Sequence, residues 1–193
     1  ALKAYKTAKD LQPLSSHLTY CVGNMHWKLG DDELALKSFQ KSIDLKPKFP
    51  EALNNAAIIL QKIGKTNSAL ILLKKVITNN PQFYQAYNNL GNICKDLDLY
   101  DHALRYYEKC VQENPLYSDG YNNIGALKIE LGDHKGAIYN FEKAIELDFT
   151  NAEAHRHLSI VKTYRKDDAH LKKMITLEST ATCSDYKKSQ LNF

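Results

Sequence analysis

The sequence has little of what disulfide-bonded, metal-binding and membrane-spanning proteins require. Its four cysteines, Cys21, Cys94, Cys110 and Cys183, form no CxxC pair, and no Cys or His cluster has zinc spacing. We therefore expect no metal or other cofactor, and free thiols in a reducing, cytoplasmic compartment. No apolar run approaches the roughly 20 residues that a membrane span needs, so no membrane partner is expected either.

An excess of charge of one sign is also missing. The net charge is +4, acidic and basic residues are interspersed, and the basic runs are pairs such as Lys74-Lys75. Proteins that bind nucleic acid usually carry a basic face, so we expect no nucleic-acid partner. His155 and His157 would point about 200° apart on a helix, which makes them poor partners for one metal. No nucleophile and base can be singled out, so the sequence predicts no catalytic residues.

What the sequence does contain is a repeat of 34 residues. Three columns recur at this spacing: prolines (Pro13, Pro47, Pro81, Pro115), alanines (Ala1, Ala35, Ala69, Ala103, Ala137) and bulky apolar residues (Tyr5, Phe39, Leu73, Tyr107, Phe141). Independent composition would almost never keep these columns in register. The chain is therefore predicted to be a tandem array of one structural unit.

Each repeat predicts two helices joined by a tight turn. With the proline at repeat position 32, positions 4, 7, 8 and 11 share one face of a first helix, and positions 20, 24 and 27 share one face of a second. Small residues at positions 8 and 20 let the two helices approach closely. The turn between them is marked by Gly30, Gly64, Asp98 and Gly132. Glycine there suits the left-handed geometry that ends a helix, and the proline stops the second helix.

These residues resemble the tetratricopeptide repeat. The segments YNNLGNICKDLDLYDHALRYYEKCVQENP and YNNIGALKIELGDHKGAIYNFEKAIELD are close to its consensus, and the resemblance covers residues 1 to about 164. It implies an all-α, right-handed superhelical solenoid of antiparallel helix pairs, with a concave groove that binds a protein or an extended peptide. The tail HRHLSIVKTYRKDDAHLKKM is similar to the linker before a sulfotransferase domain in some bacterial proteins, which implies an attached enzyme beyond residue 193.

The repeat register predicts the division of the chain. The predicted parts are the second helix of a truncated repeat over 1–15, repeats over 16–49, 50–83, 84–117 and 118–151, and a degenerate repeat with capping helices over 152–193. The incomplete first repeat or the degenerate last one could stack on a copy of itself, so a homo-oligomer through the terminal helices is an alternative function.

Positions 2, 6, 9 and 13 of each first helix point about 180° away from the core stripe, so we expect them to line the groove. Position 6 holds Asn55, Asn89 and Asn123. An amide donates and accepts hydrogen bonds, so it can pair with the backbone of a bound peptide. Helices about 10 Å apart would meet about every third residue of an extended peptide. A similar asparagine ladder is known in the repeats of O-linked N-acetylglucosamine transferase; alternatively, these amides bond neighbouring helices or water.

The other predicted groove residues are mostly polar or charged. They are Asn24, Asn92, Lys28, Lys62, Asp96, Asp119, Glu130 and His157, with Trp27 at the groove edge. The lysines lie in the early repeats and the acids mainly in the later ones. We therefore expect a ligand that is basic toward the C-terminal repeats. Alternatively, these charges are only solvated surface groups. Trp27 could anchor a ligand or pack against the preceding helix. The cations of the two-carboxylate clamp of chaperone-binding repeats are missing, because Tyr20 and Gln85 stand at two of its positions.

The sequence therefore predicts a non-catalytic scaffold that holds an extended peptide. The alternative to it, besides self-association, is a repeat module that recruits substrate to an attached enzyme of the sulfotransferase type.

Overall fold

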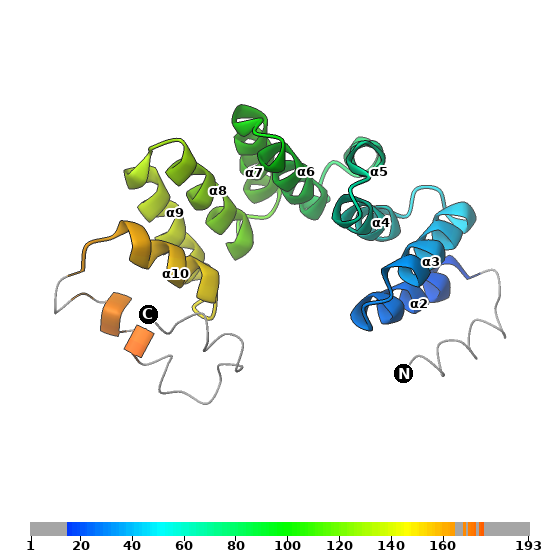
Figure 1. Ribbon diagram of the computed structural model, residues 1–193, viewed down its shortest axis with the longest axis horizontal. Helices are drawn as coiled ribbons and strands as arrows, with labels where there is room; N and C mark the ends of the chain where they lie inside the picture. The colour runs from blue at the N-terminus through cyan, green and yellow to red at the C-terminus, as the bar shows by residue number, and fades with distance from the viewer. Residues whose placement is uncertain (1–14, 165–167, 169, 173, 176–193) are drawn as a thin grey trace. The chain divides into compact units, whose positions relative to one another are not determined.

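The computed structural model describes residues 15–164, 168, 170–172 and 174–175, and every regular element in this part is helical. The helices follow one another as pairs, and Figure 1 shows that the two members of a pair within one compact unit of the chain run in opposite directions. The prediction of an all-α array of antiparallel helix pairs is confirmed. The truncated repeat predicted over 1–15, apart from Ser15, lies outside the described residues, as does most of the segment after residue 164 that was predicted to form capping helices.

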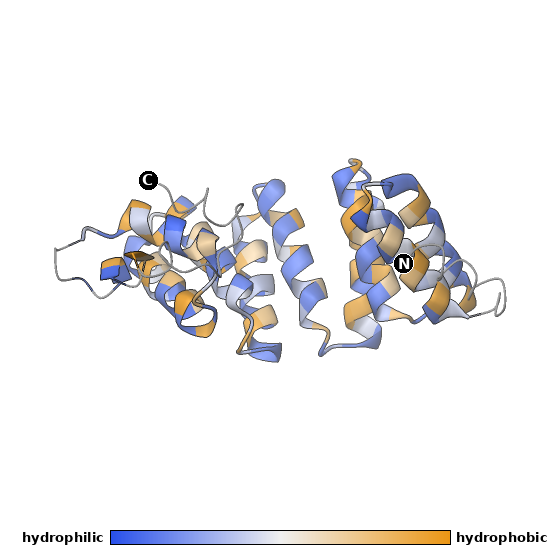
Figure 2. Ribbon diagram, turned by 90° about the horizontal axis from the view of Figure 1, so that it is seen from below, coloured by the Kyte–Doolittle hydropathy of each residue, from blue (hydrophilic) through white to orange (hydrophobic). Residues whose placement is uncertain are grey.

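The helices fall into two sets. The first helices of the repeats are α2 (Ser16–Lys28), α4 (Pro50–Lys62), α6 (Tyr84–Asp96), α8 (Ser118–Glu130) and α10 (Ala152–Val161). The second helices are α3 (Asp32–Leu45), α5 (Thr66–Asn79), α7 (Tyr100–Glu113) and α9 (His134–Leu147). Each of them has both buried and exposed residues, and Figure 2 shows hydrophobic and hydrophilic residues side by side on the helical ribbons. The amphipathic pattern predicted from the sequence is therefore present in both sets.

The turns between paired helices have the predicted left-handed backbone. Gly30, Gly64 and Gly132 have φ angles of 83°, 77° and 77°, and Asp98 has a φ of 58°. Glycine adopts this geometry without strain, whereas an aspartate needs its short polar side chain to tolerate it. The Asp98 carboxylate accepts a hydrogen bond of 2.9 Å from the hydroxyl of Tyr100 in the following helix.

The core includes more positions of the first helices than the sequence predicted. Positions 20, 24 and 27 of the four second helices are at most 1% exposed, as predicted. Three of the first helices, α4, α6 and α8, however, also bury both positions 3 and 10, for example Ala52 and Ile59 in α4. The single stripe predicted for them was too narrow, because a first helix packs against its own second helix and also against the second helix of the preceding repeat, as α4 does with α5 and α3.

The chain divides into two compact units between Leu97 and Asp98, which is inside the third predicted repeat. The described part of the first unit contains α2 to α6, and that of the second contains α7 to α10. Each unit has first helices that carry the polar positions predicted to bind a ligand.

Candidate functional site

In the first unit the groove asparagines bond to the neighbouring helix. The Nδ2 group of Asn55 donates to Oδ1 of Asn24 at 3.0 Å and to the hydroxyl of Tyr20 at 3.3 Å. The Nδ2 group of Asn89 donates to Oδ1 of Asn54 at 2.8 Å. These side chains therefore join successive first helices, as the alternative interpretation of the asparagine column predicted.

The partners of this asparagine column were not predicted from the sequence. Asn54, Asn88 and Asn122 stand at repeat position 5 and are only 5%, 8% and 3% exposed. They recur every 34 residues like the column beside them, which is the signal that could have found them. The predicted core contained mainly apolar residues. A buried amide is also stable, however, where a neighbouring repeat supplies its hydrogen bond.

Asn55 and Asn89 differ in how many hydrogen-bonding groups remain for a ligand. Asn55 directs its amide nitrogen at two acceptors, whereas among the described residues only Asn54 bonds the amide of Asn89. A side-chain amide has two N–H donors and a carbonyl acceptor. Half-buried Asn89 therefore keeps one donor and its carbonyl for a ligand. Asn92 lies one turn further along the same half-exposed side of α6.

The predicted charges of the first unit are partly neutralised. Lys62 forms an ion pair of 2.5 Å with Asp32 in the preceding second helix. Asp96 accepts a hydrogen bond of 3.1 Å from Gln61. Lys28 is exposed at the end of α2. A ligand would therefore meet less positive charge on this face than the lysines alone predicted.

Trp27 packs within its own repeat. Its ring meets Phe39 of α3 edge to face, with ring centroids 6.4 Å apart. It also lines a cavity of about 250 Å³ together with Cys21, Asn24, Met25 and Lys28. The helix predicted to precede it lies outside the described residues, so packing of Trp27 against that helix stays a prediction, as does its role as a ligand anchor.

The second unit presents a more acidic face. Desolvation of the carboxyl, followed by the charges of Glu153 and Asp148, raises the pKa of Asp119. Asn151 donates a hydrogen bond of 3.2 Å to the same carboxylate and lowers the pKa in part. Glu130 is exposed at the end of α8, and Asn123 is half-buried on the same helix. Burial is the larger cause of this raised pKa, and the charges of Glu153 and Asp148 add a negative potential at the Asp119 carboxyl.

His157 occupies the place in α10 that Asn89 occupies in α6. Its Nε2 lies 2.8 Å from the guanidinium of Arg156, which only donates, so Nε2 accepts. Its Nδ1–H then donates to Oδ1 of Asn122 at 3.0 Å. The column predicted to bind peptide therefore joins neighbouring helices in this unit as well.

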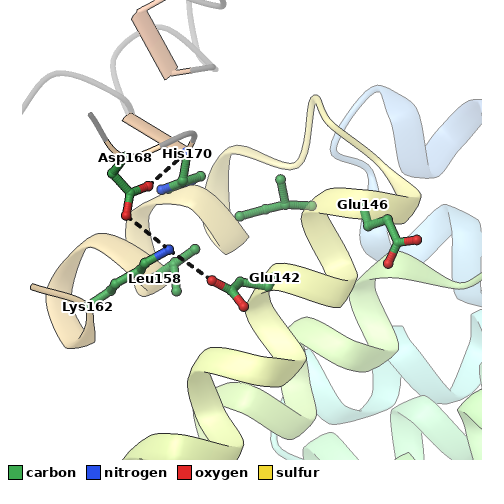
Figure 3. Close-up of a pocket in the computed structure, with 7 residues that line it drawn as sticks. Glu142, Glu146, Leu158, Lys162, Asp168 and His170 are labelled. Atoms are coloured by element: carbon green, nitrogen blue, oxygen red, sulfur yellow. Dashed lines mark hydrogen bonds and ion pairs between the residues drawn. The ribbon is translucent and has the colours of Figure 1, made fainter. Parts of the chain in front are cut away.

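A second cavity lies beside α9 and α10 and was not predicted from the sequence. It encloses about 300 Å³ and is lined in part by Glu142, Leu158, Lys162, Asp168 and His170. Figure 3 shows the Lys162 amine between the carboxylates of Glu142 and Asp168, which lie 2.9 Å and 3.3 Å away. Partial burial would lower the pKa of Lys162, but these two partners outweigh it and raise the pKa. The amine is thus protonated at neutral pH and is no nucleophile.

A chain of hydrogen bonds runs behind this cavity. His155 is fully buried, with Nε2 3.0 Å from the carbonyl of Phe149 and Nδ1 2.7 Å from Nε2 of His170. The Nδ1 of His170 lies 2.6 Å from the hydroxyl of Tyr164. A carbonyl only accepts, so with both rings neutral each donates from Nε2, and the Tyr164 hydroxyl donates to His170. One direction of donation satisfies every group.

Tyr164 should make this contact sensitive to alkaline pH. Burial, followed by the charges of Asp168 and Glu142, raises the pKa of Tyr164 to about 12, against about 10 in an unfolded chain. Between these values the unfolded chain loses the proton first, so the stabilisation is complete below pH about 10 and is lost as pH rises through the folded pKa. We expect the stability advantage of the wild type over Tyr164→Phe to shrink across this range in denaturant titrations. A constant difference would contradict it.

Two general features bear on the kind of site. Within the described residues, no group of three or more His, Cys, Asp or Glu side chains could hold a metal ion. The same part of the chain contains no helix that is both long and apolar enough to cross a membrane. The linker to a sulfotransferase domain, the cytoplasmic location and the self-association through terminal helices are tested by none of these observations and stay predictions.

Comparisons with known proteins find the same repeat. One family model of the tetratricopeptide repeat matches residues 84–117, and a second matches 22–49 and 118–151. The solved structure of TTC0263, a thermophilic TPR protein in Thermus thermophilus, is 20% identical with a TM-score of 0.74, over 92% of this chain and 97% of that one.

Two further solved structures are similar. MamA 41-end from Desulfovibrio magneticus RS-1 is 24% identical with a TM-score of 0.67, over 86% of this chain and 97% of that one. YrrB, described as a TPR protein with an unusual peptide-binding site, is 18% identical with a TM-score of 0.64, over 91% of each chain. At these identities the likeness concerns the fold. No curated protein sequence gives a significant match.

Proposed function

Because this chain is built of tetratricopeptide repeats, we propose that it is a non-catalytic scaffold that holds an extended peptide segment of another protein against its first helices. The observation that carries the proposal is the state of Asn89. Its side chain is half-buried on the predicted ligand face, and its bond to Asn54 leaves one donor and the carbonyl available. The description of the similar protein YrrB as having a peptide-binding site supports this class of function.

The proposed contact depends on the fixed orientation of the amide. Asn54 is buried, so its bond to Asn89 holds the Asn89 side chain in one rotamer before any ligand arrives. A donor that is already ordered loses less conformational entropy on binding than a free surface side chain. One amide can pair with both the N–H and the C=O of a peptide backbone, which favours extended segments of varied sequence.

The charge of the second unit, taken by itself, supports a basic peptide segment as a ligand of that unit. Asp119 lies close enough to Glu153 and Asp148 for their charges to raise its pKa. A lysine or arginine of a bound peptide would relieve this repulsion and lower the pKa again. Binding of such a segment to the second unit should weaken as salt is added, because exposed charges are screened.

A matched pair of alanine variants tests the peptide site. Asn89→Ala and Asn54→Ala remove the same interhelical hydrogen bond, but only Asn89 can touch a ligand. Each should lower the free energy of unfolding by about 1 kcal/mol. Asn89→Ala should weaken the binding of peptides that the wild type selects from a displayed random library by about fivefold to tenfold, whereas Asn54→Ala, which removes only the ordering of the Asn89 side chain, should weaken it less. Isothermal titration calorimetry measures the affinities.

Three results would contradict the proposal. The wild type could select no peptide, the Asn89→Ala variant could bind as the wild type does, or both variants could lose affinity equally. The last result would mean that the asparagine column serves only to join the helices.

A further inference from the structure

The repeats differ in how a small residue at position 8 faces a large residue at position 24. In the first repeat a Cβ atom added to Gly23 would lie 2.6 Å from Cε1 of Phe39. In the fourth repeat a Cβ atom added to Gly125 would lie 2.5 Å from Cε1 of Phe141. Both contacts are far below van der Waals distance, so an aromatic ring at position 24 requires glycine at position 8.

The second repeat has the opposite combination. It carries Ala57 at position 8 and Leu73 at position 24, and both side chains are buried. The alanine methyl group and the smaller leucine replace the glycine and the ring. A cavity of about 90 Å³ lies next to them, with Ile93 of α6 as another part of its apolar wall.

The fourth repeat indicates what would fill this space. There the ring of Phe141 reaches the following first helix, and its centroid lies 5.3 Å from that of the His157 ring. His157 and Asn89 stand at the same repeat position. Asn89 lines the cavity beside Ala57 and Leu73. The cavity is therefore open because Leu73 lacks the atoms with which an aromatic ring reaches this position.

The same cavity has an unused hydrogen-bond acceptor in its wall. Oε1 of Gln61 is buried, and no described residue supplies it with a donor. The Nε2 group of the same side chain donates to Asp96, which fixes the orientation of the amide. A buried oxygen without a partner is unfavourable, and a ligand N–H would satisfy it. Asn89 and Asn92 complete the polar part of the wall.

We infer that this pocket receives one aliphatic side chain of the extended peptide, while Oε1 of Gln61 accepts an N–H of the peptide backbone. The inference rests on the proposed function and assigns it a specificity. The volume of about 90 Å³ equals that of about three water molecules and is well below the ~150 Å³ cavity that binds benzene. The pocket therefore favours valine, leucine or isoleucine over an aromatic residue.

The double variant Ala57→Gly/Leu73→Phe closes the pocket without removing core volume. It copies the arrangement of Gly125 and Phe141, so the helix pair keeps a packing that this chain already uses. The matched control is Ile71→Phe, which makes the same type of change on α5 at a side chain that is 67% exposed. Circular dichroism and the melting temperature check that both variants are folded.

The probe is the displayed library of random peptides. The wild type and Ile71→Phe should select peptides with an aliphatic residue at one fixed place. The double variant should bind these peptides at least about tenfold more weakly, because that is the loss expected when one aliphatic side chain is no longer buried. In the wild type, a selected peptide should also shift the methyl resonances of Leu73 and Ile93. This second measurement does not depend on how the double variant folds.

The outcomes separate this inference from the proposed function. Selected peptides without an aliphatic preference, equal binding to the double variant, or unshifted methyl resonances would overturn the pocket and leave the scaffold in place. A preference for aromatic side chains would overturn the size argument and with it the inference. Failure to select any peptide would overturn both proposals.

Discussion

Replacing Gly125 with alanine is expected to lower the free energy of unfolding of the second unit by about 2 kcal/mol, because the added methyl group overfills the core. The added Cβ would lie 2.5 Å and 2.7 Å from two ring carbons of Phe141. Phe141 is fully buried, so its ring has no free space to move into. This loss of stability is opposite in sign to the usual gain of about 1 kcal/mol when alanine replaces glycine inside a helix.

Chemical denaturation, combined with hydrogen exchange of the α8 and α9 amides, measures this loss. The control is the double variant Gly125→Ala/Phe141→Leu, which copies Ala57 and Leu73 of the second repeat. It should be more stable than Gly125→Ala alone, since the leucine leaves room for the methyl group, and the two changes should be coupled. An increase in stability for Gly125→Ala alone would show that the close approach of the two helices is absent.

Replacing His155 with leucine should also have a large effect, lowering the free energy of unfolding by about 2–4 kcal/mol, because two hydrogen bonds of the buried His155 ring are lost. The carbonyl of Phe149 and Nε2 of His170 each bond to the His155 ring, which is fully buried. Leucine fills most of the volume but offers no hydrogen bond. We expect the described residues around His170 to detach from α10 before the rest of the unit unfolds.

The two methionines report this detachment separately. Met174 is buried near His170 in sequence, whereas Met25 belongs to α2 of the first unit. In His155→Leu the Met174 methyl resonance should move to the position of a solvent-exposed methionine, and that of Met25 should not change. The same substitution at exposed His102 should alter stability by less than about 0.5 kcal/mol. An unchanged Met174 resonance in His155→Leu would mean that the hydrogen-bond chain does not hold this segment.

The candidate site was only partly predictable, and the asparagines show why. The face that carries Asn55, Asn89 and Asn123 follows from helical geometry, because positions of a first helix that point away from its core stripe must be less buried. Whether an amide on that face faces a ligand or a neighbouring helix depends on what the next repeat places opposite it. The bond from Asn89 to Asn54 joins residues 35 positions apart and is set by how α4 and α6 pack.

The sequence by itself determined the repeat, the helix pairs and their turns. A period of 34 residues with Gly30, Gly64, Asp98 and Gly132 at the turns specifies local geometry, and local geometry depends on residues close together in the chain. Only the tertiary structure decided the contact of His155 with His170, the orientation of Asn89 and the pocket beside Leu73. Each of these depends on the exact distance between packed helices, and a difference smaller than one side chain changes it. No pattern along the sequence encodes that distance.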